Sequence, residues 1–135
     1  MKLSPSEILD RYAIVYLKYT RISPDKFSKE FCALDKEIEQ LKLQFPQFNW
    51  ESWNTYFLNI HKFIWRLEAG TKSCKETLPE PNYLLDKKND EVLKKAGIIN
   101  FLIKDFNKLR VEFKNIVSEL CKEGFIDIKK NHLSE

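Results

Sequence analysis

This sequence has few of the residues that interrupt regular secondary structure, with 3 glycines and 5 prolines among 135 residues. Small β-rich domains need frequent turns, so this scarcity argues against strand-rich folds and favours a few long helices. The 3 cysteines are odd in number and widely spaced, and they form no C-x-x-C pair. The cysteine pattern therefore predicts reduced thiols, with neither a disulfide framework nor a zinc site.

Long apolar runs and blocks of one charge are also missing. The apolar runs are far shorter than the roughly 20 residues that span a bilayer, and no signal-peptide pattern opens the chain. The 23 basic and 20 acidic side chains alternate along the whole length. Such mixing is typical of solvated helix faces and argues against a nucleic-acid partner, which requires a basic surface. We therefore expect a cytoplasmic protein with no membrane segment.

Apolar side chains make up 43% of the residues and aromatic ones 13%, which is enough for one core in a single domain. Helical spacing of these residues predicts an all-α fold, a bundle of four principal helices with a long C-terminal helix and a short extended C-terminal tail. The predicted helices cover about 5–22, 24–43, 50–69 and 89–122. A mobile loop is expected over about 71–83, and the extended tail over 125–129.

Local signals mark where these helices begin and end. Ser4-Pro5-Ser6-Glu7 and Ser23-Pro24-Asp25 each combine a cap residue with a proline at the first helical position. Gly70 predicts the end of the third helix, and Gly97 is a weak point inside the last one. The first helix is apolar on two sides, which is typical of a central helix or of an interface. The second has heptad spacing, which we interpret as an ordinary bundle helix facing one neighbour.

A line of polar residues runs along the third predicted helix. Asn54, His61 and Glu68 are spaced by seven residues, so they lie on one side of the helix together with Trp65. In one interpretation they line a ligand pocket, where Trp65 stacks on a ring or sugar, His61 exchanges a proton and Glu68 binds a cation or hydroxyl. In the other they make structural hydrogen bonds at the margin of the apolar face.

Arg110 lies at the flank of the apolar stripe of the last helix, where a guanidinium needs a partner. Glu68 and Asp10 are the candidate carboxylates for a structural ion pair. Asn107 and Lys114 lie one turn to either side and extend the polar strip. The alternative is an anion or phosphate site formed by basic residues, namely Arg11, Arg110 and Lys114.

Enzyme motifs do not match this sequence. It contains no E-x-x-H, H-E-x-x-H, glycine-rich phosphate loop or nucleophile turn. It also lacks the paired magnesium-binding carboxylates of the helical nucleotide pyrophosphohydrolases. His132 is expected to be exposed to solvent. We therefore predict no catalytic residue, no metal ligand and no cofactor. The candidate ligand-binding residues are His61, Trp65, Glu68, Asn107, Arg110 and Lys114.

Four segments together show a resemblance to a known group of proteins. They read S-P-S-E-I-L-D-R-Y at 4–12, N-I-H-K-F-I-W-R-L-E-A-G at 59–70, F-N-K-L-R-V-E-F-K-N-I at 106–116 and G-F-I-D-I-K-K-N-H at 124–132. The chain resembles small helical proteins of unknown function from bacterial surface-glycan gene clusters and from phage or viral genomes. The shared features are the W-x-x-E step of Trp65 and Glu68 and the N-x-x-R step of Asn107 and Arg110. The resemblance implies no activity, cofactor or partner.

These observations favour a non-enzymatic binding or interaction module. We expect it to self-associate as a homo-oligomer, or to bind a protein partner, through surplus apolar surface on the first or second helix. The alternative is a small-molecule binding protein or hydrolase, with an anionic, nucleotide- or sugar-like ligand between the third and fourth helices. A glycan-related accessory role is a third option, which rests on the resemblance alone.

Overall fold

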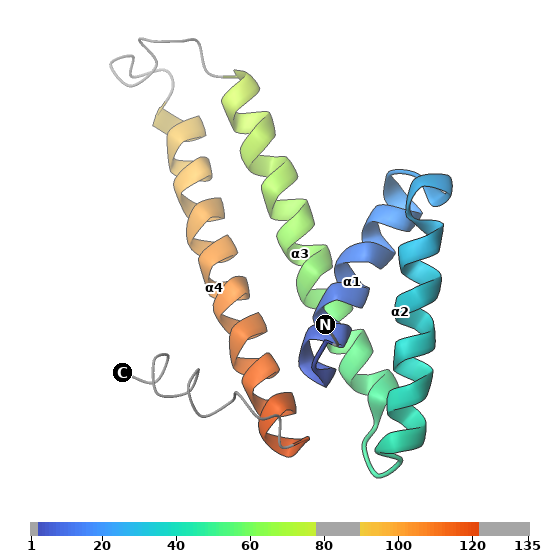
Figure 1. The fold of residues 1–135 in the computed structure, drawn as a ribbon. Coiled ribbons are helices and arrows are strands. Elements are labelled where there is room, and N and C mark those ends of the chain that lie inside the picture. Colours follow the sequence, from blue (N-terminus) through green and yellow to red (C-terminus); the bar gives the residue numbers. More distant parts are fainter. Residues whose placement is uncertain (1–2, 78–89, 122–135) are drawn as a thin grey trace.

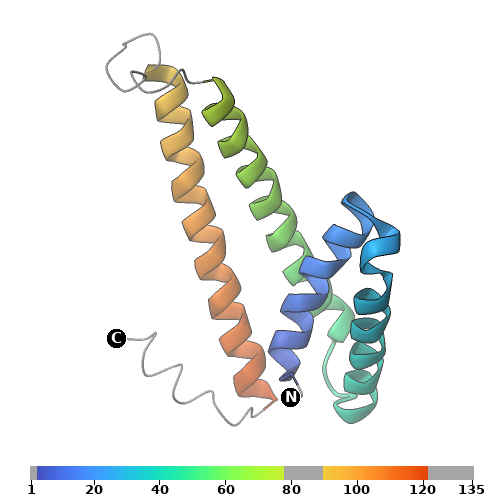
Figure 2. The same cartoon turned by 45° about the horizontal axis from the view of Figure 1, so that its top comes forward.

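The structure, a computed structural model, describes residues 3–77 and 90–121, and side chains within 3–74 and 90–121. These residues form four helices: α1 (Pro5–Arg21), α2 (Pro24–Gln44), α3 (Trp50–Thr77) and α4 (Asp90–Leu120). Figures 1 and 2 show α1 beside α2 in one hairpin and α3 beside α4 in a second, longer hairpin. The predicted all-α bundle is confirmed. The predicted tail, His132 and the loop residues 78–83 lie outside the described residues.

The first two helices begin at the predicted cap residues. Ser4 Oγ accepts a hydrogen bond from the Glu7 amide at 3.4 Å and donates one to Glu7 Oε1 at 3.0 Å. Ser23 Oγ accepts from the Lys26 amide at 3.2 Å. Each cap satisfies an amide that the first helical turn leaves unpaired. Because Ser23 begins α2 directly after α1 ends, the two helices are joined by a tight corner.

The first helix is central, since α1, like α3, packs against all three other helices. Toward α2, the Tyr19 and Phe31 rings stack with their centroids 4.6 Å apart. On its other side, Ala13 and Leu17 are buried. Both apolar sides of α1 are thus used inside the bundle. On α2 the heptad residues Leu34, Ile38 and Leu41 are buried, which confirms an ordinary bundle helix.

The predicted surplus of apolar surface on the first or second helix is therefore wrong. Among the described residues, the exposed large apolar side chains of this part of the chain are Ile22, which caps the end of α1, and Leu43 of α2. Six such side chains lie on α4, which packs against α3 and α1 but not against α2. Position in the bundle explains the absence on α1, which its three neighbours enclose, whereas α2 and α4 each have two neighbours and differ in sequence.

The third helix does not end at Gly70 as predicted, because α3 continues to Thr77. A Cβ atom at Gly70 would lie 3.1 Å from Ile99 Cδ1 of α4. Gly70 therefore permits a close approach of two helices rather than ending one of them. The predicted loop over 71–83 is accordingly wrong for residues 71–77, which are helical. The last helix, α4, is continuous through Gly97.

The α3/α4 hairpin extends beyond the α1/α2 hairpin at the end where Thr77 and Asp90 lie (Figure 1). At the opposite end α1, α2, α3 and α4 share one core, which contains the fully buried side chains Ile8, Leu9, Ala13, Phe57 and Val117. None of the described helices combines the length and apolar character needed to cross a membrane.

Candidate functional site

A buried ionic cluster lies where α1 crosses the α3/α4 hairpin, and its centre is Asp10 of α1. The Asp10 side chain is 11% exposed, and its Oδ1 lies 2.6 Å from Nε2 of His61 on α3. The same oxygen lies 3.8 Å from Nε of Arg110, and Oδ2 lies 3.7 Å from Nζ of Lys114, both on α4. One carboxylate therefore links three helices through three nitrogen-bearing side chains.

The electrostatics of this cluster keep Asp10 ionised. Burial alone would raise the pKa of the Asp10 carboxyl, but the hydrogen bond with His61 and the positive charges of Arg110 and Lys114 outweigh it. They hold the pKa below the ordinary value of 3.8. Since the ionised carboxylate can only accept, the His61 Nε2–H donates to Asp10 Oδ1.

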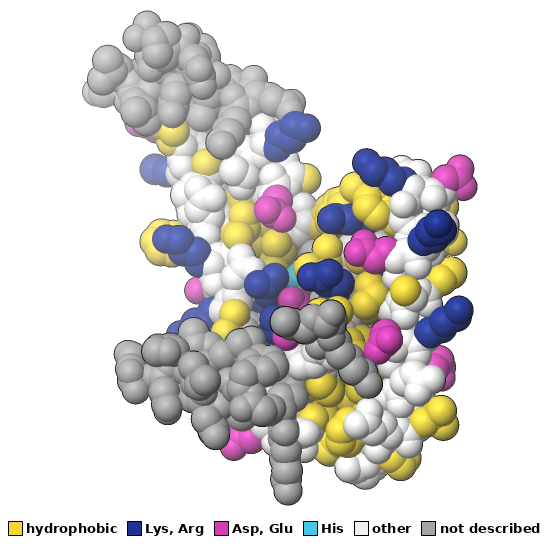
Figure 3. All heavy atoms as spheres, in the orientation of Figure 1, with side chains coloured by type: hydrophobic (Ala, Val, Ile, Leu, Met, Phe, Trp, Pro, Cys, Tyr) yellow, Lys and Arg dark blue, Asp and Glu magenta, His cyan; other side chains and the backbone are white. Residues whose placement is uncertain are grey.

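The cluster contains more positive than negative charge. The basic side chains of Arg110 and Lys114 share the single carboxylate of Asp10. Figure 3 shows basic and acidic side chains gathered at mid-height on this face, between α1 and the α3/α4 hairpin. The excess positive charge favours an additional anion close to Arg110 and Lys114.

A cavity of about 330 Å³ adjoins this cluster. Its walls come from α1, α3 and α4, and its lining residues are Ile14, Leu17, Lys18, His61, Ile64, Trp65, Glu68, Asn107 and Arg110. Five of the six residues selected from the sequence therefore meet at one cavity. The sixth, Lys114, does not line it but is joined to it through Asp10.

Polar groups at this cavity have unused hydrogen-bonding capacity. Arg110 Nε is buried without a hydrogen-bond partner, since its distance of 3.8 Å from Asp10 is too long for one. Glu68, which is exposed, and Asn107, which is half-buried, make no hydrogen bond or ion pair with the rest of the described chain. A buried donor without a partner costs roughly 1–3 kcal/mol. A ligand with several acceptor atoms would complement such a cavity.

Trp65 forms an aromatic wall of the cavity, and cations surround it. The Arg21 guanidinium lies 6.0 Å from the centre of the Trp65 ring. Lys18, one turn earlier in α1, lines the cavity itself. Arg110 adds a third cation, whereas Glu68 is the one acidic side chain among the lining residues. The cavity therefore offers an aromatic surface beside a mainly basic set of side chains.

The structure also decides between the partners expected for Arg110. Asp10 is the carboxylate that pairs with it, whereas Glu68 lies at the cavity wall without an ion pair. Asn54 and Arg11, which the sequence also suggested, do not line the cavity. The sequence predicts Asp10 only as a partner for Arg110, although the position of Asp10 contains a further signal. It lies within the buried α1 stripe of Ser6, Ala13 and Leu17, where a carboxylate requires several partners.

Asp10 is the cluster residue that the candidate set lacked, and Lys18 is a cavity residue that it lacked. Lys18 looks like an ordinary solvated lysine in the sequence, and only the packing of α1 against α3 places it at the cavity. Within the part of the chain that the structure describes, no group of three or more His, Cys, Asp or Glu side chains could hold a metal ion.

A larger cavity, of about 550 Å³, lies between the start of α1 and the end of α2. Its charged lining residues are Lys36 and Glu37, which are opposite in sign and are not joined to a buried ionic cluster. The smaller cavity is therefore the better candidate for a charged ligand.

Comparison with family models, with curated proteins and with solved structures finds no match to this chain. What the fold and the site define is an all-α helical bundle with a buried ionic cluster beside a small basic cavity.

Proposed function

We propose that this protein binds a small anionic ligand in the cavity between α1, α3 and α4. The observation that carries the proposal is the shared carboxylate of Asp10, which faces both Arg110 and Lys114 beside an open cavity. Burying charge is costly unless each charge is compensated. An anionic group near Arg110 and Lys18 would supply the missing negative charge.

The walls of the cavity limit the rest of the ligand. Ile14, Ile64 and Trp65 offer apolar and aromatic surface, while Asn107 and Glu68 offer hydrogen-bonding groups. A cavity of about 330 Å³ is at the small end of ligand pockets, which span roughly 300–1,000 Å³. This combination favours a phosphorylated or carboxylated compound with one ring, such as a nucleoside monophosphate or a sugar phosphate.

Binding is better supported than hydrolysis by the same residues. No serine, threonine or cysteine is among the described lining residues, so the cavity offers no hydroxyl or thiol nucleophile. His61 is occupied by Asp10 through its Nε2 atom, which fits an orienting role in the cluster.

A thermal-shift comparison tests this proposal. Inorganic phosphate, a nucleoside monophosphate and a hexose phosphate are each compared with the parent nucleoside and hexose. A ligand at 100 times its Kd stabilises the folded state by about 2.7 kcal/mol. We expect at least one phosphorylated compound to raise Tm while its unphosphorylated parent does not. Equal shifts with and without the phosphate group would contradict an anion site.

Two variants separate specific binding from general stabilisation by anions. Arg110→Lys keeps the positive charge next to Asp10 but removes the planar set of donors, so it should lose most of the shift while remaining folded. Lys18→Ala removes a cation that lines the cavity and has no carboxylate partner there, and it should weaken the shift. Lys108→Arg is the matched control on the exposed side of α4, and it should leave the shift unchanged.

A further inference from the structure

The α3/α4 hairpin carries an exposed apolar surface, made of eight of the ten large apolar side chains that are exposed among the described residues. We call this surface the hairpin face, and it consists of Tyr56 and Phe63 on α3 with Ile98, Phe101, Leu102, Leu109, Ile116 and Leu120 on α4. Phe101 is 72% exposed and Ile98 is 61% exposed. Isolated exposed apolar residues are ordinary, but a contiguous group of them indicates a binding surface.

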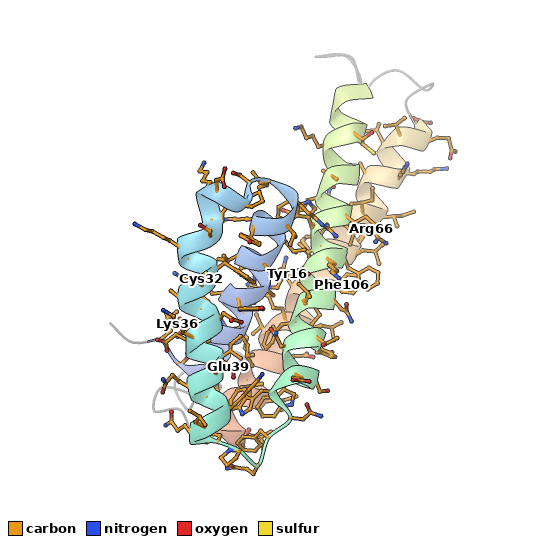
Figure 4. All side chains as sticks on the ribbon, turned by 90° about the vertical axis from the view of Figure 1, so that its right-hand side faces the viewer. Tyr16, Cys32, Lys36, Glu39, Arg66 and Phe106 are labelled. Carbon is orange, nitrogen blue, oxygen red and sulfur yellow. The ribbon has the colours of Figure 1, made fainter. Side chains whose placement is uncertain are left out.

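Aromatic contacts join the two helices across this face. Phe63 of α3 stacks on Phe106 of α4 with centroids 5.1 Å apart, and Tyr56 packs on Phe113 at 4.2 Å. In Figure 4 the labelled Phe106 lies on the side of the hairpin away from α1 and α2. The hairpin face is thus separate from the cavity, which α1 covers on the other side.

The hairpin face is large enough for a protein partner. Its eight side chains are about half exposed, and with roughly 180 Å² of surface on each they leave on the order of 700 Å² uncovered. The largest apolar patch on a typical monomer measures roughly 300–600 Å². A partner in a standard interface buries about 800 Å². The exposed area therefore approaches what a stable dimer needs.

The spacing of the α4 residues is symmetric. Leu102 and Ile116 each lie seven residues from Leu109, and Ile98 and Leu120 each lie eleven residues from it. When a second α4 helix packs antiparallel on the first with a two-fold axis at Leu109, Leu109 faces Leu109 of the other copy. Leu102 then faces Ile116, and Ile98 faces Leu120. A two-fold interface requires such self-complementarity, because the same surface is used by both copies.

We infer that the hairpin face binds a second copy of this chain, with the two α4 helices antiparallel and Leu109 on the two-fold axis. The charges that border the stripe argue against a parallel pair. A parallel pair would place Asp105 against Asp105 and Glu112 against Glu112, which is repulsive. An antiparallel pair avoids these identical contacts: Glu112 faces position 106 of the other copy, one residue from Asp105 and two residues from Lys108.

The oligomeric state of the full chain is the first test, and analytical ultracentrifugation over a wide concentration range measures it. We expect a dimer whose dissociation constant rises at least about 100-fold in Leu109→Glu, because two introduced carboxylates meet on the axis in apolar surroundings. Leu43→Glu is the matched control, since Leu43 is 78% exposed on α2, away from the hairpin face. It should dimerise as the parent does. A parent chain that stays monomeric at every concentration overturns the inference, as does a Leu109→Glu dimer of unchanged affinity.

Cysteine cross-linking tests the register and does not depend on the folding of Leu109→Glu. The background is Cys32→Ser, because Cys32 is exposed whereas Cys74 and Cys121 are buried. Leu109→Cys should form a disulfide-linked dimer by itself, since cross-linking requires Cα atoms within about 7 Å. Leu102→Cys should cross-link to Ile116→Cys in a mixture and fail to cross-link to itself. Efficient Leu102→Cys self-linkage would show a parallel pair and overturn the antiparallel register.

Discussion

Asp10 connects three helices through a single carboxylate, and it is mostly buried. Replacing it with asparagine keeps the size of the side chain but leaves Arg110 and Lys114 without a negative partner. Breaking a fully buried pair costs roughly 3–5 kcal/mol. Arg110 and Lys114 are 29% and 23% exposed, so solvent lowers the cost, and we expect Asp10→Asn to lose about 2 kcal/mol at pH 7. Urea unfolding measures this loss.

The pH dependence of the same contribution has a defined sign. The pKa of Asp10 is lower in the folded chain than in the unfolded one, so its contribution is present above the unfolded pKa of about 3.9 and is lost as the pH falls below it. The stabilities of the parent and of Asp10→Asn should therefore converge as the pH falls below that value. Asp35→Asn, at an exposed position on α2, is the control. A difference that is the same at pH 7 and pH 3 would contradict the ionic role of Asp10.

Part of this site is predictable at the scale of single residues. His61 and Glu68 are seven residues apart on one helix, so helical geometry alone places them on the same side. Asn107 and Arg110 are three residues apart, and the same argument applies to them. Asp10 and Lys18 reach the cavity only because α1 lies across the α3/α4 hairpin, and that contact spans long distances in the sequence.

At the scale of the element, the glycines of α3 and α4 have different roles. Gly97 lies in α4, and apart from the backbone of its own helical turn no atom lies within 4 Å of where its Cβ would be. Gly97→Ala should therefore stabilise the protein by about 1 kcal/mol, the difference in helix propensity between the two residues. At Gly70 the same substitution would place a Cβ 3.1 Å from Ile99 Cδ1.

Gly70→Ala is the matched comparison for this prediction, because both sites are helical and differ in their surroundings. Ile99 would have to move by a few tenths of an ångström, which offsets part of the gain in helix propensity. Thermal unfolding of the two variants should rank Gly97→Ala above Gly70→Ala. Equal gains would mean that Gly70 is not a packing position.

The prediction of a helix end at Gly70 failed for a physical reason. Glycine is common just after helices because it adopts left-handed backbone angles easily, but it also lets two helices approach closely. From the sequence alone, a glycine at this position is consistent with either role. The serine caps at Ser4 and Ser23 are different, because their hydrogen bonds are made within the same turn and need no partner helix.

At the scale of the whole molecule, stability is expected to be unequal along the long hairpin. Phe57 and Val117 are fully buried near the α1/α2 end, where the core lies. In the described part of the hairpin that extends beyond α1 and α2, Cys74 and Ile99 are the buried side chains. Regions with little buried apolar surface open at lower free energy than the core.

Native-state hydrogen exchange measures these openings. We expect the amides of residues 66–74 and 92–101 to exchange through openings of lower free energy than those of 54–60 and 113–119. Leu109→Glu is the appropriate sample, because protection that comes from a second copy would be reduced in it. Uniform protection along α3 and α4 in this variant would contradict a core confined to one end.

Residues close together in the sequence determined the four helices and the starts of α1 and α2. They also determined that His61, Trp65 and Glu68 share one side of α3, because these features depend on interactions within a turn or two. Only the tertiary structure decided that Asp10 is the partner of Arg110, that Gly70 lies inside a helix and that α4 carries the exposed apolar face. Each of these depends on which helix faces meet. That choice is made by packing over the whole chain, and periodicity along a single helix does not contain it.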